Sequence, residues 1–381
     1  MSNKVKPIIR FKGYTDDWEE RKLGEEVESI GTGKSKFITG KKKSLENPYP
    51  VLGSTSVISY DAEFDNSGDF ILTARVGANA GNLYTYSGNV KISDNTVYIK
   101  SKNLYFIYYL LLKFNLKQLA FGTGQPLVKS SELKQLRLMF SNGIKEQQKI
   151  GSFFKQLDDT IALQERKLDL LKEQKKGYLQ KMFPKQNEKV PELRFSGFTD
   201  DWEQRKLGEL GSVSMNRRIF KEETTENGEI PFYKIGTFGT TADAYISRSL
   251  FEKYKEKYPY PAKGDLLISA SGSIGRIVEY NGEDEYFQDS NIVWLKHDNR
   301  LINSFLKQFY SIVKWEGLEG STIKRLYNKN ILETKIELPK PQEQTKIGNF
   351  FKQLDETIAL QESKLEKMKE MKTGFLQKMF I

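Results

Sequence analysis

The sequence predicts an α+β protein in which two similar α/β domains are separated by two long helices, paired as an antiparallel coiled coil with internal pseudo-two-fold symmetry. Three observations support this prediction. The segment "TDDWEERKLGE" at Thr15 returns as "TDDWEQRKLGE" at Thr199. A longer segment, residues 146–183, returns at 343–380 with most residues unchanged. Both copies of the longer segment carry apolar residues at alternating four- and three-residue steps, the heptad pattern of a coiled coil.

These repeats divide the chain into a duplicated frame, made of the matching segments, and two interiors at about 29–143 and 212–341. The 381 residues are enough for two or three domains. The interiors share short β-rich runs, "GDFILTARVGANAGNL" beside "GDLLISASGSIGRI" and "DNTVYIK" beside "SNIVWLK", each followed by an apolar helix. We therefore predict a first domain at 1–143, a first helix at 144–184, a linker and second domain at 185–341, and a second helix at 342–381.

Polar residues within the heptad seam indicate how the two helices pair. Parallel alignment would place Lys175 against Lys372, and two facing lysines repel. Antiparallel alignment places Lys175 near Leu354, where the lysine stem can lie on apolar surface. Packing of each helix on its own domain is the alternative. The predicted seam is Ile150, Phe154, Leu157, Ile161, Gln164, Leu168, Leu171, Lys175, Tyr178 and Met182 in the first helix, and Ile347, Phe351, Leu354, Ile358, Gln361, Leu365, Met368, Lys372, Phe375 and Met379 in the second.

Composition limits the chemistry of the chain. Sixty Lys and Arg against 50 Asp and Glu leave a net charge of +10, which favours an anionic partner such as nucleic acid. With no cysteine and a single histidine, His297, the sequence argues against disulfides, zinc fingers and Ser/His or Cys/His catalysis. The longest apolar run, nine residues from Leu104, is too short to cross a membrane, so we expect a cytoplasmic protein.

Three short motifs resemble catalytic signatures without completing them. "GTGKS" at Gly31 lacks the first glycine of a phosphate-binding loop, since Glu28 stands at that position. "NPYP" at Asn47 departs from the Asn-Pro-Pro-aromatic signature of base methyltransferases, and "EMK" at Glu370 lies in the predicted second helix. We predict no catalytic residues and no metal ligands.

Two related but divergent basic domains suit a duplex, because DNA presents similar groove geometry to two readers related by a dyad. Since the interiors differ, each domain is expected to read a different short sequence, and the paired helices would set the unread gap. The repeated "TDDWE" segments, the "FFKQLD" and "TIALQE" helices and the endings "GYLQKMF" and "GFLQKMF" are similar to the specificity subunit of type I restriction-modification systems.

This resemblance covers the whole chain and implies two target recognition domains in a non-catalytic subunit of a bacterial defence system. It implies binding of double-stranded DNA, of two modification subunits that methylate adenines with S-adenosylmethionine, and of restriction subunits that use ATP and magnesium. No cofactor would be bound by this chain. The helices and the neighbouring segments, with Trp18 and Trp202, are where modification subunits would dock, although tryptophans in a repeated frame are more often core residues.

We expect DNA contacts from polar residues in glycine-containing loops, because arginine suits guanine and Asn or Gln suits adenine in the major groove. In the first domain these are Lys34, Lys36, Arg75, Asn79, Asn82, Thr123, Gln125 and Lys129; in the second they are Arg217, Arg218, Lys234, Ser271, Ser273, Arg276, Thr322, Lys324 and Arg325. Two alternatives are a coiled-coil adaptor or scaffold without DNA readout, and a self-sufficient nuclease or methyltransferase. Salt-dependent duplex binding would exclude the adaptor.

Overall fold

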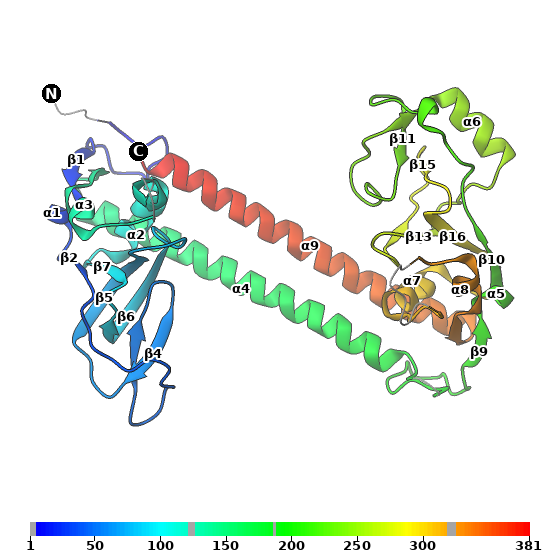
Figure 1. The fold of residues 1–381 in the computed structure, drawn as a ribbon, viewed down its shortest axis with the longest axis horizontal. Helices are drawn as coiled ribbons and strands as arrows, with labels where there is room; N and C mark the ends of the chain where they lie inside the picture. The colour runs from blue at the N-terminus through cyan, green and yellow to red at the C-terminus, as the bar shows by residue number, and fades with distance from the viewer. Residues whose placement is uncertain (1–4, 121–125, 186–187, 318–324) are drawn as a thin grey trace. The chain divides into compact units, whose positions relative to one another are not determined.

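A computed structural model describes residues 5–120, 126–185, 188–317 and 325–381 (Figure 1). The chain forms two compact units. The first unit contains Met1–Arg166 and Glu362–Ile381, and the second contains Lys167–Gln361. Each long helix therefore contributes one part to each unit, and each unit contains the beginning of one helix and the end of the other.

A six-stranded sheet forms the centre of the first unit. Its strand order is β2-β7-β5-β6-β3-β4, and all neighbours are antiparallel except β3 and β6. The last five residues of β5 are all buried, as expected for a strand covered on both faces. The strands are β2 (Ser29–Thr32), β3 (Tyr49–Leu52), β4 (Val57–Asp61), β5 (Asn66–Ala74), β6 (Leu83–Ile92) and β7 (Thr96–Lys100).

Helices and a small second sheet complete the first unit. Strand β1 (Glu19–Lys22) pairs antiparallel with β8 (Arg137–Phe140). The apolar helix α2 (Leu104–Phe114) supplies six buried residues to the core. The last residues of the chain join this core, since the ring of Phe380 lies 6.2 Å from Trp18 and 5.6 Å from Phe106. The short elements are α1 (Leu23–Glu26), the 3-10 helix η1 (Leu116–Ala120) and α3 (Ser130–Gln135).

The second unit repeats this plan with a different arrangement of strands. A four-stranded sheet has the order β10-β16-β13-β14, a three-stranded sheet has the order β12-β11-β15, and β17 pairs with β9. The strands are β9 (Glu203–Lys206), β10 (Gly211–Ser214), β11 (Ile230–Tyr233), β12 (Tyr245–Ile246), β13 (Leu266–Ser269), β14 (Ile277–Glu279), β15 (Tyr286–Phe287), β16 (Ile292–His297) and β17 (Lys335–Leu338). The helices are α5 (Leu207–Leu210), the 3-10 helix η2 (Lys221–Glu223), α6 (Arg248–Lys257), α7 (Asn303–Ile312) and α8 (Asn328–Glu333).

The two units share the packing of the frame and differ in their interiors. Trp18 packs edge-on against Phe106 of α2 at 5.9 Å, and Trp202 packs in the same way against Phe305 of α7 at 5.8 Å. Both tryptophans are fully buried, so their role in the frame is core packing. In contrast, the three-stranded sheet of the second unit has a separate apolar core around Phe251 and Tyr286. The fold is therefore mixed α and β, as predicted.

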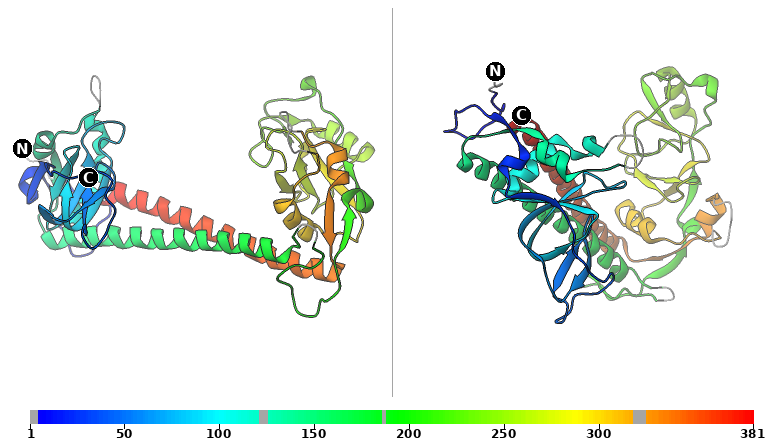
Figure 2. Two further views of the ribbon diagram at one scale, coloured as in Figure 1. Left: turned by 60° about the horizontal axis from the view of Figure 1, so that its bottom comes forward. Right: turned by 60° about the vertical axis from the view of Figure 1, so that its left-hand side comes forward.

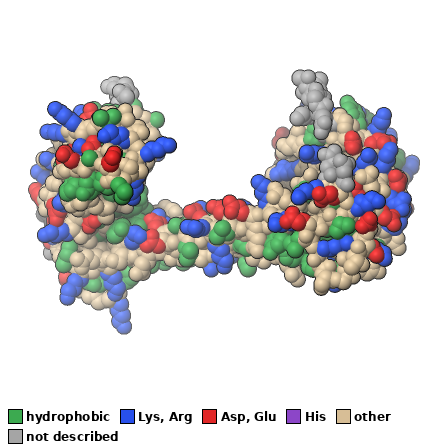
Figure 3. All heavy atoms as spheres, turned by 90° about the horizontal axis from the view of Figure 1, so that it is seen from below, with side chains coloured by type: hydrophobic (Ala, Val, Ile, Leu, Met, Phe, Trp, Pro, Cys, Tyr) green, Lys and Arg blue, Asp and Glu red, His purple; other side chains and the backbone are tan. Residues whose placement is uncertain are grey.

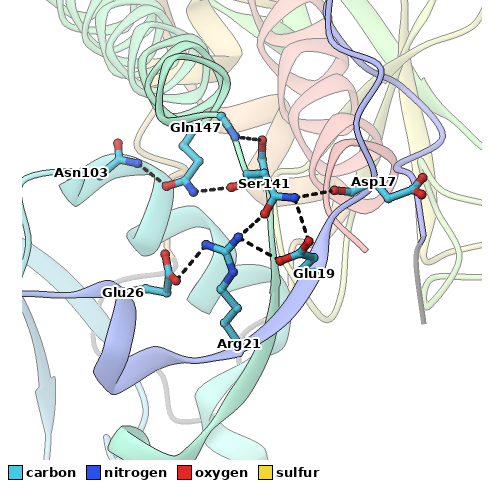
Figure 4. Close-up of polar contacts among 9 residues, drawn as sticks. Asp17, Glu19, Arg21, Glu26, Asn103, Ser141 and Gln147 are labelled. Carbon is cyan, nitrogen blue, oxygen red and sulfur yellow. Dashed lines mark hydrogen bonds and ion pairs between the residues drawn. The ribbon is translucent and has the colours of Figure 1, made fainter. Parts of the chain in front are cut away.

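Helices α4 (Ile144–Met182) and α9 (Pro341–Met379) are the two long helices expected from the repeat. Proline at the first position of α9 is favoured there, because its missing N–H has no helical partner. A polar network joins the start of α4 to the "TDDWE" segment (Figure 4). Gln147 donates to the Ser141 carbonyl at 2.7 Å and accepts from Asn103 at 2.6 Å, while Asn142 donates to Glu19 at 3.0 Å.

The helices run antiparallel within each unit (Figures 1 and 2). In the first unit Lys372 of α9 lies 2.5 Å from Asp158 of α4, and Phe153 packs against Phe375 at 5.3 Å. In the second unit Lys175 of α4 lies 2.5 Å from Asp355 of α9. Each seam lysine thus meets a carboxylate of the other helix, which is a stronger reason for antiparallel pairing than the burial of its stem.

Every predicted seam residue is buried or half-buried. The remaining faces of the helices are mostly exposed and charged, for example at Lys167, Asp169 and Lys367. The seam residues also take part in the cores of the units, as Ile150 and Phe154 do in the first and Ile347 and Phe351 do in the second. The two packing alternatives are therefore combined, because the beginning of each helix packs on its own domain as well as on the other helix.

Candidate nucleic-acid interface

The predicted basic loops of the first unit meet at the turn between β6 and β7. The N–H of Gly33, just after β2, donates to the Thr96 carbonyl at 2.9 Å. The N–H of Arg75, just after β5, donates to the Asn95 carbonyl at 2.9 Å. Lys34 and Lys36 therefore lie on one side of this turn and Arg75 on the other, and all three side chains are exposed.

A second loop joins Arg75 to Lys129. The N–H of Val128 donates to the Arg75 carbonyl at 2.8 Å, and the N–H of Gly77 donates to the Pro126 carbonyl at 3.1 Å. Asn79 and Asn82 close the loop that follows Arg75, since the Asn82 side-chain amide donates to Asn79 at 3.2 Å. The structure thus gathers Arg75, Asn79, Asn82 and Lys129 on adjoining loops. Thr123 and Gln125 lie outside the described residues.

A hollow of about 470 Å³ lies beside these loops and contains residues that the sequence did not point to. Lys34 and Ser35, which follow β2, share it with Ser130 and Lys134 of α3. Lys134 is exposed and brings a second positive charge to the hollow. It was missed because α3 is about one hundred residues from β2 in the chain, and only the folded sheet makes them neighbours.

Three predicted residues of the second unit lie on the loop after β13, and this loop contacts neighbouring loops. Ser271 donates to the side chain of Asn291 at 2.8 Å. The guanidinium of Arg276 donates to the Phe238 carbonyl at 2.7 Å, across a hollow of about 240 Å³ that Ser273 also lines. The described loops therefore form a second cluster, in which Ser271, Ser273 and Arg276 lie together.

Two further predicted cations of the second unit have partners within the fold. Lys234 makes an ion pair with Asp243 at 2.9 Å. Arg325 donates to the Ser290 carbonyl at 2.9 Å, which places it beside the same cluster. Thr322 and Lys324 lie outside the described residues.

Arg217 and Arg218 contact a different set of residues. The guanidinium of Arg217 lies 5.3 Å from the ring of Tyr258, and that of Arg218 lies 5.7 Å from the ring of Phe220. Strand β10 pairs antiparallel with β16 as β2 pairs with β7, so the two strands are equivalent. Arg217 and Arg218 follow β10, and Lys34 follows β2. In both units, therefore, a basic residue follows this strand.

Two backbone hydrogen bonds occur in both units, at the residue that follows β5 in the first unit and β13 in the second. Arg75 donates to Asn95 and accepts from Val128; Ala270 donates to Asn291 at 2.7 Å and accepts from Leu326 at 2.8 Å. Ala270 is therefore the structural counterpart of Arg75. An alignment of the two "GD" segments by sequence alone matches Arg75 with Ser271, one residue away from its structural counterpart. The hydrogen bonds of the strands give the correct register, which the sequences of the two interiors are too different to show.

The surface charge is mixed rather than uniformly basic. On the face drawn in Figure 3, Lys and Arg side chains project from both units with Asp and Glu side chains among them. His297 has a structural environment, since its ring nitrogens lie 2.6 Å from Asn303 and 2.9 Å from the Asp298 carbonyl. Within the described ranges, no group of three or more His, Cys, Asp or Glu is placed to hold a metal ion. No helix in these same ranges is long and apolar enough to span a membrane.

Comparison with known proteins agrees with the duplicated architecture. The family described as the type I restriction modification DNA specificity domain matches twice, at residues 15–173 and 199–370. A type I restriction enzyme specificity subunit of Haemophilus influenzae is 38% identical over 335 residues, which cover 85% of this chain and 84% of that protein. The MjaVIII specificity subunit of Methanocaldococcus jannaschii is 23% identical, and the match covers 94% of this chain and 90% of that protein.

Solved structures share the fold. The crystal structure of a type I restriction-modification S subunit from M. genitalium has a TM-score of 0.67 at 18% identity and covers 99% of both chains. A structure from a study of complex assembly and conformational transition of the type I restriction-modification system has a TM-score of 0.53 at 17% identity, covering 95% of this chain and 97% of that one. The two family matches and the Haemophilus relative show that this chain belongs to the specificity subunits of type I restriction-modification systems, which are non-catalytic and supply DNA sequence recognition.

Proposed function

We propose that each interior reads one half of a bipartite, asymmetric DNA site. One observation carries this proposal: the same frame, with its tryptophan packing and helix starts, surrounds a six-stranded sheet in one unit and two smaller sheets in the other. Because the frame is the same in both units, each unit could bind its half of the site in the same way. Because the loops differ, each unit could recognise a different base sequence. The candidate contacts are the loop clusters around Arg75 and around Ser271.

The exposed lysines and the loop side chains would have different tasks. Lys34, Lys36 and Lys129 would contact phosphates, which contribute affinity at any sequence. Arg75, Asn79 and Asn82 are suited to base edges, because arginine pairs with guanine and asparagine with adenine. Thr123, Gln125, Thr322 and Lys324 remain predicted contacts from the sequence alone.

The paired helices would set the gap between the half-sites and dock two modification subunits. Their antiparallel seam, with one Lys–Asp pair in each unit, supports a fixed register between the helices. Restriction subunits would join the same assembly. The S-adenosylmethionine, ATP and magnesium of the reactions would be bound by these partners and not by this chain. We propose that this assembly acts on DNA in the cytoplasm.

A coiled-coil adaptor without DNA readout is the second reading. It is less well supported, since an adaptor gives no reason for two different interiors on one frame. Duplex binding that weakens steeply with salt would contradict it.

Mapping of methylated adenines tests the proposal. The chain would be expressed with its cognate modification subunits in cells that carry plasmid DNA. We expect two short motifs at one fixed gap, with methylated adenines on opposite strands. A single continuous motif would contradict reading by two domains, and a formed complex that methylates nothing would favour the adaptor.

A further inference from the structure

The backbone of Arg75 is held on both sides. Its N–H donates to the Asn95 carbonyl at 2.9 Å, and its carbonyl accepts from the Val128 N–H at 2.8 Å. Both bonds belong to the main chain, so they remain whichever side chain stands at this position. The side chain itself is exposed. Position 75 therefore combines a fixed backbone with a side chain that is presented to solvent.

The second unit has the same backbone arrangement without a long side chain. Ala270 makes the equivalent bonds to Asn291 and from Leu326, and only 1% of Ala270 is exposed. The structure thus identifies one equivalent position in the two units, which presents a cation in the first and only a buried methyl group in the second. A reader of two different half-sites needs differences of this kind at equivalent positions.

Arg75 also differs from the other predicted arginines. Arg276 and Arg325 use their guanidinium groups to bind the carbonyls of Phe238 and Ser290. Arg217 and Arg218 lie over aromatic rings. Among the residues that the structure describes, no hydrogen bond or ion pair occupies the guanidinium of Arg75. Within the described part of the chain, its N–H donors therefore have no partner that a ligand would need to displace.

We propose that Arg75 is a specificity-determining residue that reads one guanine in the half-site of the first domain. This inference rests on the proposed function. A planar guanidinium can donate two parallel hydrogen bonds to O6 and N7 of guanine in the major groove, and no other base pair offers this pair of acceptors. Because the backbone at Arg75 is already ordered, binding would need to order the side chain alone.

The test compares base preferences of the whole assembly. The chain and its cognate modification subunits would methylate a plasmid library with randomised half-sites, as wild type and as the variants Arg75→Lys and Arg75→Ala. We expect one position of one half-site to lose its preference for guanine by about tenfold or more, whereas the other half-site and the gap stay unchanged. Arg75→Lys keeps the charge but loses the two parallel donors, so it is expected to lose discrimination with a smaller loss of overall methylation.

Arg248→Lys is the matched control, because this arginine of α6 pairs with Asp284 and Glu229 and is expected to leave both half-sites unchanged. The inference is overturned if Arg75→Ala leaves every base preference as it was, or if it lowers methylation equally for all sequences, as loss of a phosphate contact would. A wild-type assembly without a two-part motif would instead contradict the proposed function itself. The unchanged second half-site shows in the same experiment that the variants are folded.

Discussion

The guanidinium of Arg10 donates two hydrogen bonds to the carboxylate of Glu146, at 2.5 and 2.8 Å. Arg194 and Glu343 repeat this pair in the second unit, at 2.6 and 2.8 Å. Both glutamates are almost fully buried, and the hydrogen bond with its glutamate raises the pKa of each arginine. Each pair joins the segment before "TDDWE" to the start of a long helix, so the frame of each unit is closed by the same buried contact.

Removal of one partner is expected to be costly. Arg10→Met leaves the Glu146 carboxylate buried without its counter-charge, and we expect a loss of about 3 to 5 kcal/mol in the free energy of unfolding. The double variant Arg10→Met, Glu146→Gln removes the charge as well and is expected to recover most of this loss. Urea unfolding at neutral pH measures both values. Equal stability of the single and double variants would contradict an energetic role for the pair.

The seam ion pairs predict a charge-reversal result. Lys175→Asp places two carboxylates together at Asp355, and we expect destabilisation of about 1 kcal/mol, because the side chains are about one quarter to one third exposed and partly screened. The double variant Lys175→Asp, Asp355→Lys restores opposite charges and is expected to recover stability. A double-mutant cycle by thermal unfolding measures this coupling. The exposed pair within one helix, Lys155 and Asp159, is the control, and equal coupling in both cycles would contradict a special role for the seam.

The heptad pattern can be recognised in the sequence because a periodic pattern depends on local spacing alone. Ile150, Phe154, Ile347 and Phe351 recur at helical steps, and all are buried. The antiparallel direction was also predicted correctly from the repulsion of Lys175 and Lys372. The carboxylates that these lysines meet were not foreseen, since Asp158 and Asp355 lie one position beside the seam.

The interiors were less predictable, because their neighbours come from distant parts of the chain. Arg75 and Lys129 were both selected from the sequence, but their connection through Val128 required the fold. Lys134 was missed because nothing local distinguishes it from other surface lysines. The one-residue offset between an alignment of the "GD" segments and the strand register has the same origin, since register in a sheet depends on pairing with another strand.

Four glycines in the long helices predict opposite effects of the same substitution. A Cβ at Gly151 would lie 2.6 Å from the backbone nitrogen of Phe106, and one at Gly348 would collide with Oγ of Ser304. Gly177 and Gly374 have no atom within 4 Å of such a Cβ. We expect Gly177→Ala and Gly374→Ala to stabilise the chain by about 0.5 to 1 kcal/mol each, because alanine is the better helix former.

Gly151→Ala and Gly348→Ala are expected to destabilise it, since α2 and α7 must move away from the long helices. Urea unfolding of the four single variants compares them directly. Stabilisation by all four would show that the contact of α2 and α7 with the long helices is loose.

Glu285 predicts a pH effect on stability. Burial raises its pKa, with the neighbouring charge of Glu283 as a second cause. A raised pKa in the folded state means that the protonated form folds better, so this contribution is full below the unfolded pKa near 4.3 and is lost as pH rises through the folded value. Glu285→Gln is therefore expected to stabilise the chain at pH 7 but not at pH 3.5. Thermal unfolding at both pH values measures the difference, and Glu283→Gln is expected to give a smaller effect in the same direction.

Lys34 and Lys36 predict the salt dependence of DNA binding. A lysine that contacts one phosphate releases about one counterion, so log K falls against log salt with a slope of about 0.9 per contact. We expect Lys34→Ala and Lys36→Ala each to lower this slope by about one and to weaken binding equally for all sequences, since phosphates carry no sequence information. Titrations of a cognate and a scrambled duplex between 50 and 200 mM salt, roughly the range in which such contacts dominate, measure both effects. Lys253→Ala, an exposed lysine of α6 outside the predicted loops, is the control. If a variant changes the base preference while the slope stays constant, the lysine that it replaces contacts a base edge and not a phosphate.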